Sequence, residues 1–312
     1  MLKMAYQILE GVEGKEIIIE SPKERAGKIF DLLDVSESTR QDYKSRIWLF
    51  LDFIREKSLH QDSFLEFKRY LKERNDLAVA SKNKYLAAAR IFLKELNRQG
   101  LLPVDITQNI KTFNQSRKHK KEGLSETEVE LLSVSVNQLP DTPMNTRLKA
   151  VLSLLIFQGL RQIEIVRLDV KDLDLASGTA FIHGKGRDDK ELINLHPTTV
   201  NAVKSYLKKN KIGDGALFVS TSNNSRNKRL STRALREMIR GLFMQTGIEK
   251  NVHGLRHYFV TRLVREYRGD LLEVARYTRH KSLEMLQIYN DSIRHKADLP
   301  RFYKTFEGIK LA

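Results

Sequence analysis

The chain has 312 residues, no cysteine, and 55 Lys+Arg against 39 Asp+Glu, which gives a net charge of +16. This length predicts about two domains that each bury a core, and the absence of cysteine excludes disulfides and thiolate metal ligands. No apolar run reaches the roughly 18 residues of a membrane span, and the N-terminus lacks a signal-peptide core. We therefore expect a cytoplasmic protein with no membrane partner.

The positive charge lies in the middle and C-terminal parts of the chain. Residues 1–35 carry 5 basic and 7 acidic side chains, residues 36–121 carry 19 and 10, and the remainder carries 31 and 22. Such an excess attracts polyanions, although a merely solvated surface has the same composition. We expect nucleic-acid contacts from residue 36 onward, and we treat residues 1–35 as an N-terminal extension that contacts protein.

Residues 36–115 predict a small basic bundle of helices. Ser38 and Gln41 have the spacing of a capping box, and the last helix stops at Gly100 with Pro103 just beyond. The apolar residues at helical spacing fall into three runs: Tyr43, Ile47, Phe50, Leu51 and Ile54; Phe64, Phe67, Tyr70 and Leu71; and Tyr85, Ala89, Phe92, Leu93 and Leu96.

Residues 116–123 are predicted to form a basic linker. Four of its side chains are candidates for contact with a phosphate backbone: Arg117, Lys118, Lys120 and Lys121. Basic runs of this kind are usually just solvated. Ser125 and Glu128 then form a second capping box, which predicts the start of the next helix.

Residues 124–312 predict a mainly helical domain that contains one β-hairpin. Strands are expected at Ala180–His183 and Leu192–Leu195, because β-compatible runs there flank a turn rich in glycine and aspartate. Apolar residues at helical spacing between positions 148 and 156 predict a helix before the hairpin, and Pro197 and Ser231 suit the starts of two helices after it.

Two arginines lie in motifs that suit phosphate binding. Arg161 lies in GLRQIEIVRL, three residues before Glu164, and Arg256 lies in HGLRHYFVTRL, three residues after His253. An arginine next to a carboxylate is commonly a simple ion pair, and most His-x-x-Arg pairs are surface accidents. Two guanidinium groups, however, can hold the non-bridging oxygens of a phosphodiester in a two-pronged geometry that lysine lacks.

Three further groups complete a set for phosphoryl transfer. Lys185 lies at the predicted hairpin tip, where an isolated lysine is ordinarily just exposed, and Lys190 on the returning strand is its rival. His280 lies nine residues before Tyr289. A tyrosine hydroxyl can attack phosphorus, whereas lysine and histidine can move protons or donate hydrogen bonds.

The order and spacing of these residues resemble the tyrosine recombinase (phage integrase) family of DNA strand-exchange enzymes. The resemblance is strong over the C-terminal three fifths of the chain and weak over its middle. It implies catalytic roles for six residues, with Glu164 in support: Arg161, Lys185, His253, Arg256, His280 and Tyr289.

The family's roles carry over as follows. Arg161 and Arg256 would hold the scissile phosphate, and Glu164 would orient an arginine or a histidine. Lys185 would protonate the departing 5′ oxygen, and His253 would accept the proton of the tyrosine nucleophile. Two departures stand out: Gln158 replaces the usual threonine, and Arg279 replaces the glycine of the family's Leu-Gly-His, which changes the turn before the last histidine.

The resemblance also implies an architecture and partners. We expect a mainly α fold with a small β-hairpin or sheet, arranged as a two-domain DNA clamp. It would comprise a helical core-binding domain at 36–115, the linker at 116–123, and a catalytic domain at 124–312 that ends in an oligomerisation helix. The expected partners are duplex recombination sites, a homotetramer on two sites, and an accessory DNA-bending or excisionase protein. No cofactor or metal is expected, and DNA-bound protein would be associated with the nucleoid.

Two alternatives remain at this point. A type IB-like topoisomerase would use the same chemistry without partner exchange, and the basic N-terminal half and the extra C-terminal helix argue against it. A non-catalytic DNA-binding regulator would keep the fold only, and the intact six-residue set argues against that.

Overall fold

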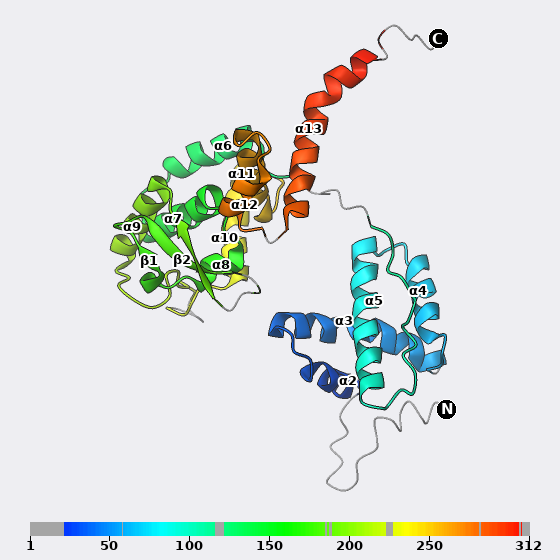
Figure 1. Cartoon of the computed structure of the whole chain (residues 1–312). Helices are drawn as coiled ribbons and strands as arrows, with labels where there is room; N and C mark the ends of the chain where they lie inside the picture. The colour runs from blue at the N-terminus through cyan, green and yellow to red at the C-terminus, as the bar shows by residue number, and fades with distance from the viewer. Residues whose placement is uncertain are drawn as a thin grey trace. The chain divides into compact units, whose positions relative to one another are not determined.

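The structure is a computed structural model, and it describes residues 22–57, 59–115, 122–184, 186, 189–222, 227–280, 282–305 and 307. The chain divides into two compact units, Met1–Ser116 and Arg117–Ala312 (Figure 1). The first contains four described helices: α2 (Pro22–Asp31), α3 (Glu37–Lys57), α4 (Ser63–Glu73) and α5 (Val79–Arg98). Among the described residues, no helix is long and apolar enough to cross a membrane.

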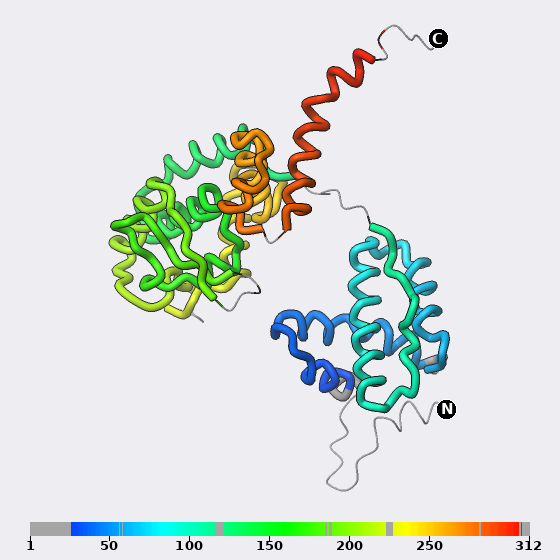
Figure 2. The backbone as a smooth tube through the Cα atoms, in the orientation of Figure 1, coloured from blue at the N-terminus to red at the C-terminus, as the bar shows by residue number. Residues whose placement is uncertain are grey.

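The core of the first unit is aromatic and aliphatic. Phe64, Phe67 and Leu71 are fully buried on one face of α4, as their helical spacing predicts. The ring of Phe67 meets that of Phe50 on α3 edge-on, with centroids 5.0 Å apart. The segment that follows α5 runs back along this helix (Figure 2), and Asn83 on α5 holds it by exchanging hydrogen bonds of 3.0 and 2.8 Å with the backbone of Phe113.

Two expectations for the start of this unit differ from the structure. Helix α2 buries Ala26, Ile29 and Phe30 in the same core, so the expected boundary at residue 36 separates helices that pack together. Helix α3 begins at Glu37, so Ser38 lies inside its first turn and does not cap it. Ser36 lies just before the helix, and its hydroxyl accepts a bond from the Thr39 amide at 3.4 Å.

The second unit surrounds helix α7. The list of its elements is: α6 (Glu126–Asn137), α7 (Pro143–Phe157), α8 (Gln162–Arg167), η1 (Val170–Asp172), β1 (Leu173–Asp174), β2 (Thr179–His183), β3 (Lys190–Asn194), α9 (Pro197–Asn210), α10 (Thr232–Gln245), α11 (His253–Glu266), α12 (Leu271–Thr278) and α13 (Leu283–Thr305). Helix α7 packs against α9, α10 and α11. The predicted capping box of Ser125 and Glu128 is confirmed at the start of α6.

The predicted hairpin is confirmed as part of a three-stranded antiparallel sheet in the order β1-β2-β3. His183 pairs with Lys190 at the end of the hairpin, and the register continues to Thr179 and Asn194. Ala180 and Ile182 are buried whereas Phe181 between them is exposed, the alternation of a sheet with one face on the core. The predicted class, mainly α with one small sheet, is therefore confirmed.

Gly159 shapes the turn between α7 and α8. Its φ is 54°, in the left-handed region that favours glycine, and a Cβ there would lie 2.1 Å from Cδ1 of Phe259 on α11. Its carbonyl also accepts a hydrogen bond from Arg256. The close approach of α11 to this turn therefore requires glycine, and it positions Arg161 two residues later.

We expect Gly159→Ala to destabilise the second unit by about 3 kcal/mol, because the added Cβ would overlap the partly buried ring of Phe259, so that the ring or the backbone of the turn must shift. Gly247→Ala is the matched control: Gly247 also has a positive φ, 70°, but nothing lies within 4 Å of its added Cβ. That variant should lose only about 1 kcal/mol, the cost of a left-handed backbone for alanine. Urea unfolding measures both, and equal losses would contradict the steric argument.

Candidate active site

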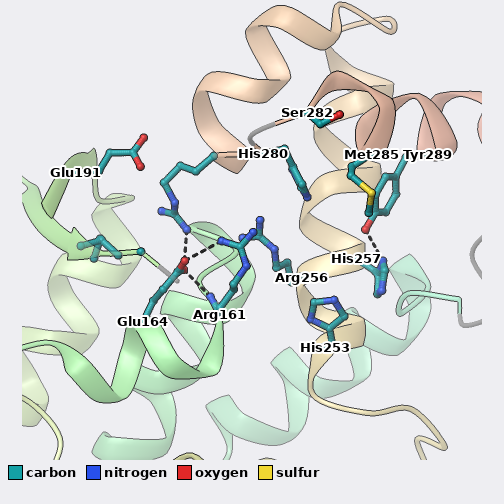
Figure 3. Close-up of a pocket in the computed structure, with 13 residues that line it drawn as sticks. Arg161, Glu164, Glu191, His253, Arg256, His257, His280, Ser282, Met285 and Tyr289 are labelled. Carbon is teal, nitrogen blue, oxygen red and sulfur yellow. Dashed lines mark hydrogen bonds and ion pairs between the residues drawn. The ribbon is translucent and has the colours of Figure 1, made fainter. Parts of the chain in front are cut away.

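A pocket of about 370 Å³ lies in the second unit, and α8, α11, α13, the residues that follow α12 and the end of the hairpin contribute to its lining (Figure 3). Five of the six predicted catalytic residues line it, together with the supporting glutamate: Arg161, Glu164, His253, Arg256, His280 and Tyr289. The sixth, Lys185, lies outside the described residues, as do the linker candidates Arg117, Lys118, Lys120 and Lys121. Gly184, which precedes Lys185, lines the pocket.

Arg161 is held at the start of α8 by Glu164. The Arg161 amide donates to Oε2 of Glu164 at 2.8 Å, and Nη1 donates to Oε1 at 2.8 Å (Figure 3). The glutamate side chain is 1% exposed and the arginine side chain 30% exposed. The carboxylate therefore fixes the arginine from behind, while part of the guanidinium group stays accessible from the pocket.

Arg256 provides a buried cation beside it. Its guanidinium donates to the carbonyl of Gly159 and, at 2.8 Å, to the carbonyl of Thr278 at the end of α12. Burial and the neighbouring charge of Arg161 lower the pKa of Arg256 to about 10. The group therefore stays protonated at neutral pH, in a position that two backbone carbonyls fix.

His280 lies next to these arginines. Its Nδ1 is 2.8 Å from the Thr278 hydroxyl. Burial, followed by the positive charges of Arg256, Arg161 and Arg279, lowers the pKa of His280 to about 3. At neutral pH the ring is therefore uncharged, so it can donate a hydrogen bond to a phosphate oxygen but does not add a third full charge.

This depressed pKa predicts a pH dependence of stability. Below about pH 6.5 a proton binds His280 in the unfolded chain but not in the folded one, so stability is full above 6.5 and falls as the pH drops toward 3. Replacement by glutamine removes the titrating group. We expect wild type to lose more thermal stability than His280→Gln between about pH 7 and pH 5. Parallel losses in the two proteins would show that His280 titrates normally.

Tyr289 faces His257 and not the predicted acceptor, His253. The Tyr289 hydroxyl lies 2.5 Å from Nδ1 of His257 (Figure 3). Burial raises the pKa of Tyr289 to about 12, against the opposing charges of Arg256 and Arg161. The hydroxyl is therefore protonated at neutral pH and needs a base to become a nucleophile. His253 lies one turn earlier on α11, with its ring edge-on to His257 at 4.6 Å between centroids.

The sequence patterns assigned no role to His257 or Arg279, although both line the pocket and form hydrogen bonds with its other residues. The four-residue spacing of His253 and His257 places both on one face of α11, so the second histidine was detectable. For Arg279 the sequence indicates only that the family's usual glycine is replaced. In the structure its Nη2 donates to Oε2 of Glu164 at 3.0 Å, and it lines the pocket.

Lys190, the alternative to Lys185, is engaged elsewhere. It starts β3, and its ammonium group forms an ion pair with the buried carboxylate of Asp172. Lys190 is not among the residues that line the pocket.

Comparison with known proteins identifies the family. Residues 123–295, more than half of the chain, match the family described as "Phage integrase family". The chain belongs to the phage integrase family. The match spans the pocket residues from Arg161 to Tyr289.

Individual relatives of this integrase family member are tyrosine recombinases. Tyrosine recombinase XerD of Oceanobacillus iheyensis is 28% identical over 290 residues, which cover 87% of this chain and 93% of the relative. Tyrosine recombinase XerC of Natranaerobius thermophilus is 32% identical over 72% of this chain and 75% of its own. The crystal structure of XerH site-specific recombinase bound to palindromic difH substrate shares the fold, with a TM-score of 0.72, 18% identity and coverage of 96% and 93%.

The chain is thus a site-specific tyrosine recombinase, an enzyme that cleaves and rejoins DNA. The topoisomerase and regulator alternatives are not favoured by these comparisons.

Proposed function

We propose that this integrase family member exchanges strands between two duplex DNA sites through a 3′-phosphotyrosyl intermediate formed by Tyr289. The observation that carries the proposal is one pocket in which the Tyr289 hydroxyl, a histidine acceptor at 2.5 Å, and the guanidinium groups of Arg161 and Arg256 are brought together. These are the groups that in-line attack on a phosphodiester needs.

The first step would be attack of the tyrosine oxygen on phosphorus. His257 is placed to take the phenolic proton, and Arg161 and Arg256 would hold the non-bridging oxygens. The bond to the 5′ oxygen breaks, and that oxygen leaves as a hydroxyl once Lys185 protonates it. Because the phosphotyrosyl ester keeps the energy of the broken bond, a 5′-hydroxyl on the partner strand can reverse the reaction without an added nucleotide.

Assembly on DNA forms the rest of the proposal. The basic first unit, acting as the core-binding domain, and linker residues Arg117, Lys118, Lys120 and Lys121 would follow the phosphate backbone. Four copies would assemble on two sites, each placing its C-terminal segment on a neighbour. Phe302 and Tyr303 on α13, 54% and 64% exposed, support this docking role. An accessory DNA-bending or excisionase protein would direct the reaction, and the complex would be associated with the nucleoid.

The test of strand exchange begins by identifying the DNA site that the protein cleaves. Fragmented chromosomal DNA is incubated with the protein, the mixture is denatured, and the strands that remain attached are sequenced. Two labelled duplexes that carry the recovered site then test exchange. We expect recombinant duplexes that join parts of the two labelled substrates, together with a covalent protein–DNA intermediate. Strands that are cleaved and rejoined only within their original duplex would contradict strand exchange.

The role of Lys185 has its own chemical test. We expect Lys185→Ala to cleave an ordinary phosphodiester at least about 100-fold more slowly, the usual effect of losing a general acid. A 5′-bridging phosphorothiolate has a sulfur leaving group that needs no proton, so it should restore most of the rate. Lys190→Ala is the control, because its ammonium group pairs with Asp172. Rescue of Lys190→Ala without rescue of Lys185→Ala would assign the acid to Lys190.

A further inference from the structure

A third arginine lies in the active-site pocket, at a position where the family usually has glycine. Arg279 follows the last residue of α12 with a φ of 55°, a left-handed conformation that glycine adopts without strain. Its side chain is only 4% exposed and reaches Glu164 on α8 at 3.0 Å. The chain thus places a bulky cation at a backbone position that disfavours any side chain, which points to a use for that cation.

The carboxylate of Glu164 lies between two guanidinium groups. The guanidinium of Arg161 contacts Oε1 at 2.8 Å and that of Arg279 contacts Oε2 at 3.0 Å, while the glutamate itself is 1% exposed. Oε2 also accepts the hydrogen bond from the Arg161 amide. A buried carboxylate needs a compensating cation. If Arg161 supplied all of that compensation, Glu164 would compete with the scissile phosphate for the same guanidinium. With Arg279 present, the three groups together carry one positive charge, and Arg161 keeps its attraction for an anion.

We propose that Arg279 is a positioning residue that neutralises Glu164 and so leaves Arg161 available to hold the scissile phosphate. The inference rests on the proposed function of the pocket and deepens it. It also explains how this chain works without the family's glycine. The chain accepts a strained backbone at this position and gains a buried cation, which acts on Arg161 through the carboxylate of Glu164.

A double-mutant cycle tests this coupling. Arg279→Gly is made alone and together with Glu164→Gln, since glutamine keeps an acceptor oxygen for Arg161 but carries no charge. Single-turnover cleavage at saturating DNA is measured separately from DNA affinity. We expect Arg279→Gly to slow cleavage at least about tenfold in the wild-type background and less than about threefold in the Glu164→Gln background, because the charge to be neutralised is absent there. Arg279→Lys, which keeps the charge, should retain most of the rate.

The matched control is Lys211→Gly. Lys211 follows α9 with the same φ of 55° but is exposed, so its replacement by glycine reports backbone relief alone and should leave cleavage unchanged. An equal loss of cleavage rate from Arg279→Gly in both backgrounds, or no loss in either, overturns the inference. The proposed function still stands in that case if the wild-type protein is active. A wild-type protein that forms no adduct contradicts the proposed function and this inference with it.

Discussion

Tyr289→Phe should abolish the covalent protein–DNA adduct and leave DNA affinity within about twofold of wild type, because phosphate contacts by basic side chains provide most of the affinity. The substitution removes one oxygen, the atom that lies 2.5 Å from His257 Nδ1. Loss of this hydrogen bond should cost about 1 kcal/mol of stability, too little to unfold the unit. A nicked suicide substrate followed by denaturing electrophoresis measures the adduct, and a filter-binding or mobility-shift assay measures the affinity.

Two other tyrosines serve as controls for this experiment. Tyr277 on α12 and Tyr303 on α13 are exposed, and neither lines the pocket. Tyr277→Phe and Tyr303→Phe should therefore form the adduct at the wild-type rate. An adduct with Tyr289→Phe would remove Tyr289 from the nucleophile's role, and loss of the adduct in one of the controls would transfer that role.

Arg161→Lys should slow cleavage about 100-fold or more despite the retained charge. An ammonium group cannot reproduce the planar two-pronged contact with a phosphate, and each lost charge-assisted hydrogen bond costs about 1.5–3 kcal/mol. Because about 1.4 kcal/mol corresponds to a tenfold change in rate, two such losses exceed 100-fold. Single-turnover cleavage of the suicide substrate measures the effect.

Arg262→Lys is the matched control for that substitution. Arg262 on α11 also pairs with a glutamate, Glu126 at 2.9 Å, but it is exposed and outside the active-site pocket. Its replacement should leave the cleavage rate within about twofold, since exposed ion pairs contribute little. Near-normal cleavage by Arg161→Lys would mean that Arg161 only holds Glu164 in place.

Local patterns in the sequence predicted most of the fold. The spacing of Phe64, Phe67 and Leu71 predicts one buried helix face, and the structure buries all three. The turn residues between positions 184 and 189 predict the hairpin, whose strands pair as expected. The acidic excess of residues 1–35 favours an extension outside the bundle, whereas the structure packs the apolar face of α2 into the core of the first unit. Such a face gains its stability from the rest of the bundle, which no short window of sequence shows.

The sequence predicted which residues make up the candidate site, but not which of them contact one another. The resemblance of their motifs to those of the tyrosine recombinase family implied that Arg161, Arg256 and Tyr289 belong together. Which histidine meets the tyrosine depends on how α13 packs on α11. The contact joins residues 32 positions apart, and it sits in a cluster built by Val260, Leu286 and their neighbours. The link from Arg279 to Glu164 spans 115 positions and depends on a left-handed residue, so sequence periodicity does not encode it.

Mapping the trapped adduct by mass spectrometry tests the central claim most directly. The covalent complex is digested with protease and nuclease, and the modified peptide is sequenced. We expect the DNA to be attached through its 3′ phosphate to the peptide that contains Tyr289, and the other DNA fragment to carry a 5′-hydroxyl that polynucleotide kinase labels without prior phosphatase treatment. Attachment at a different residue, or through a 5′ phosphate, would contradict the account.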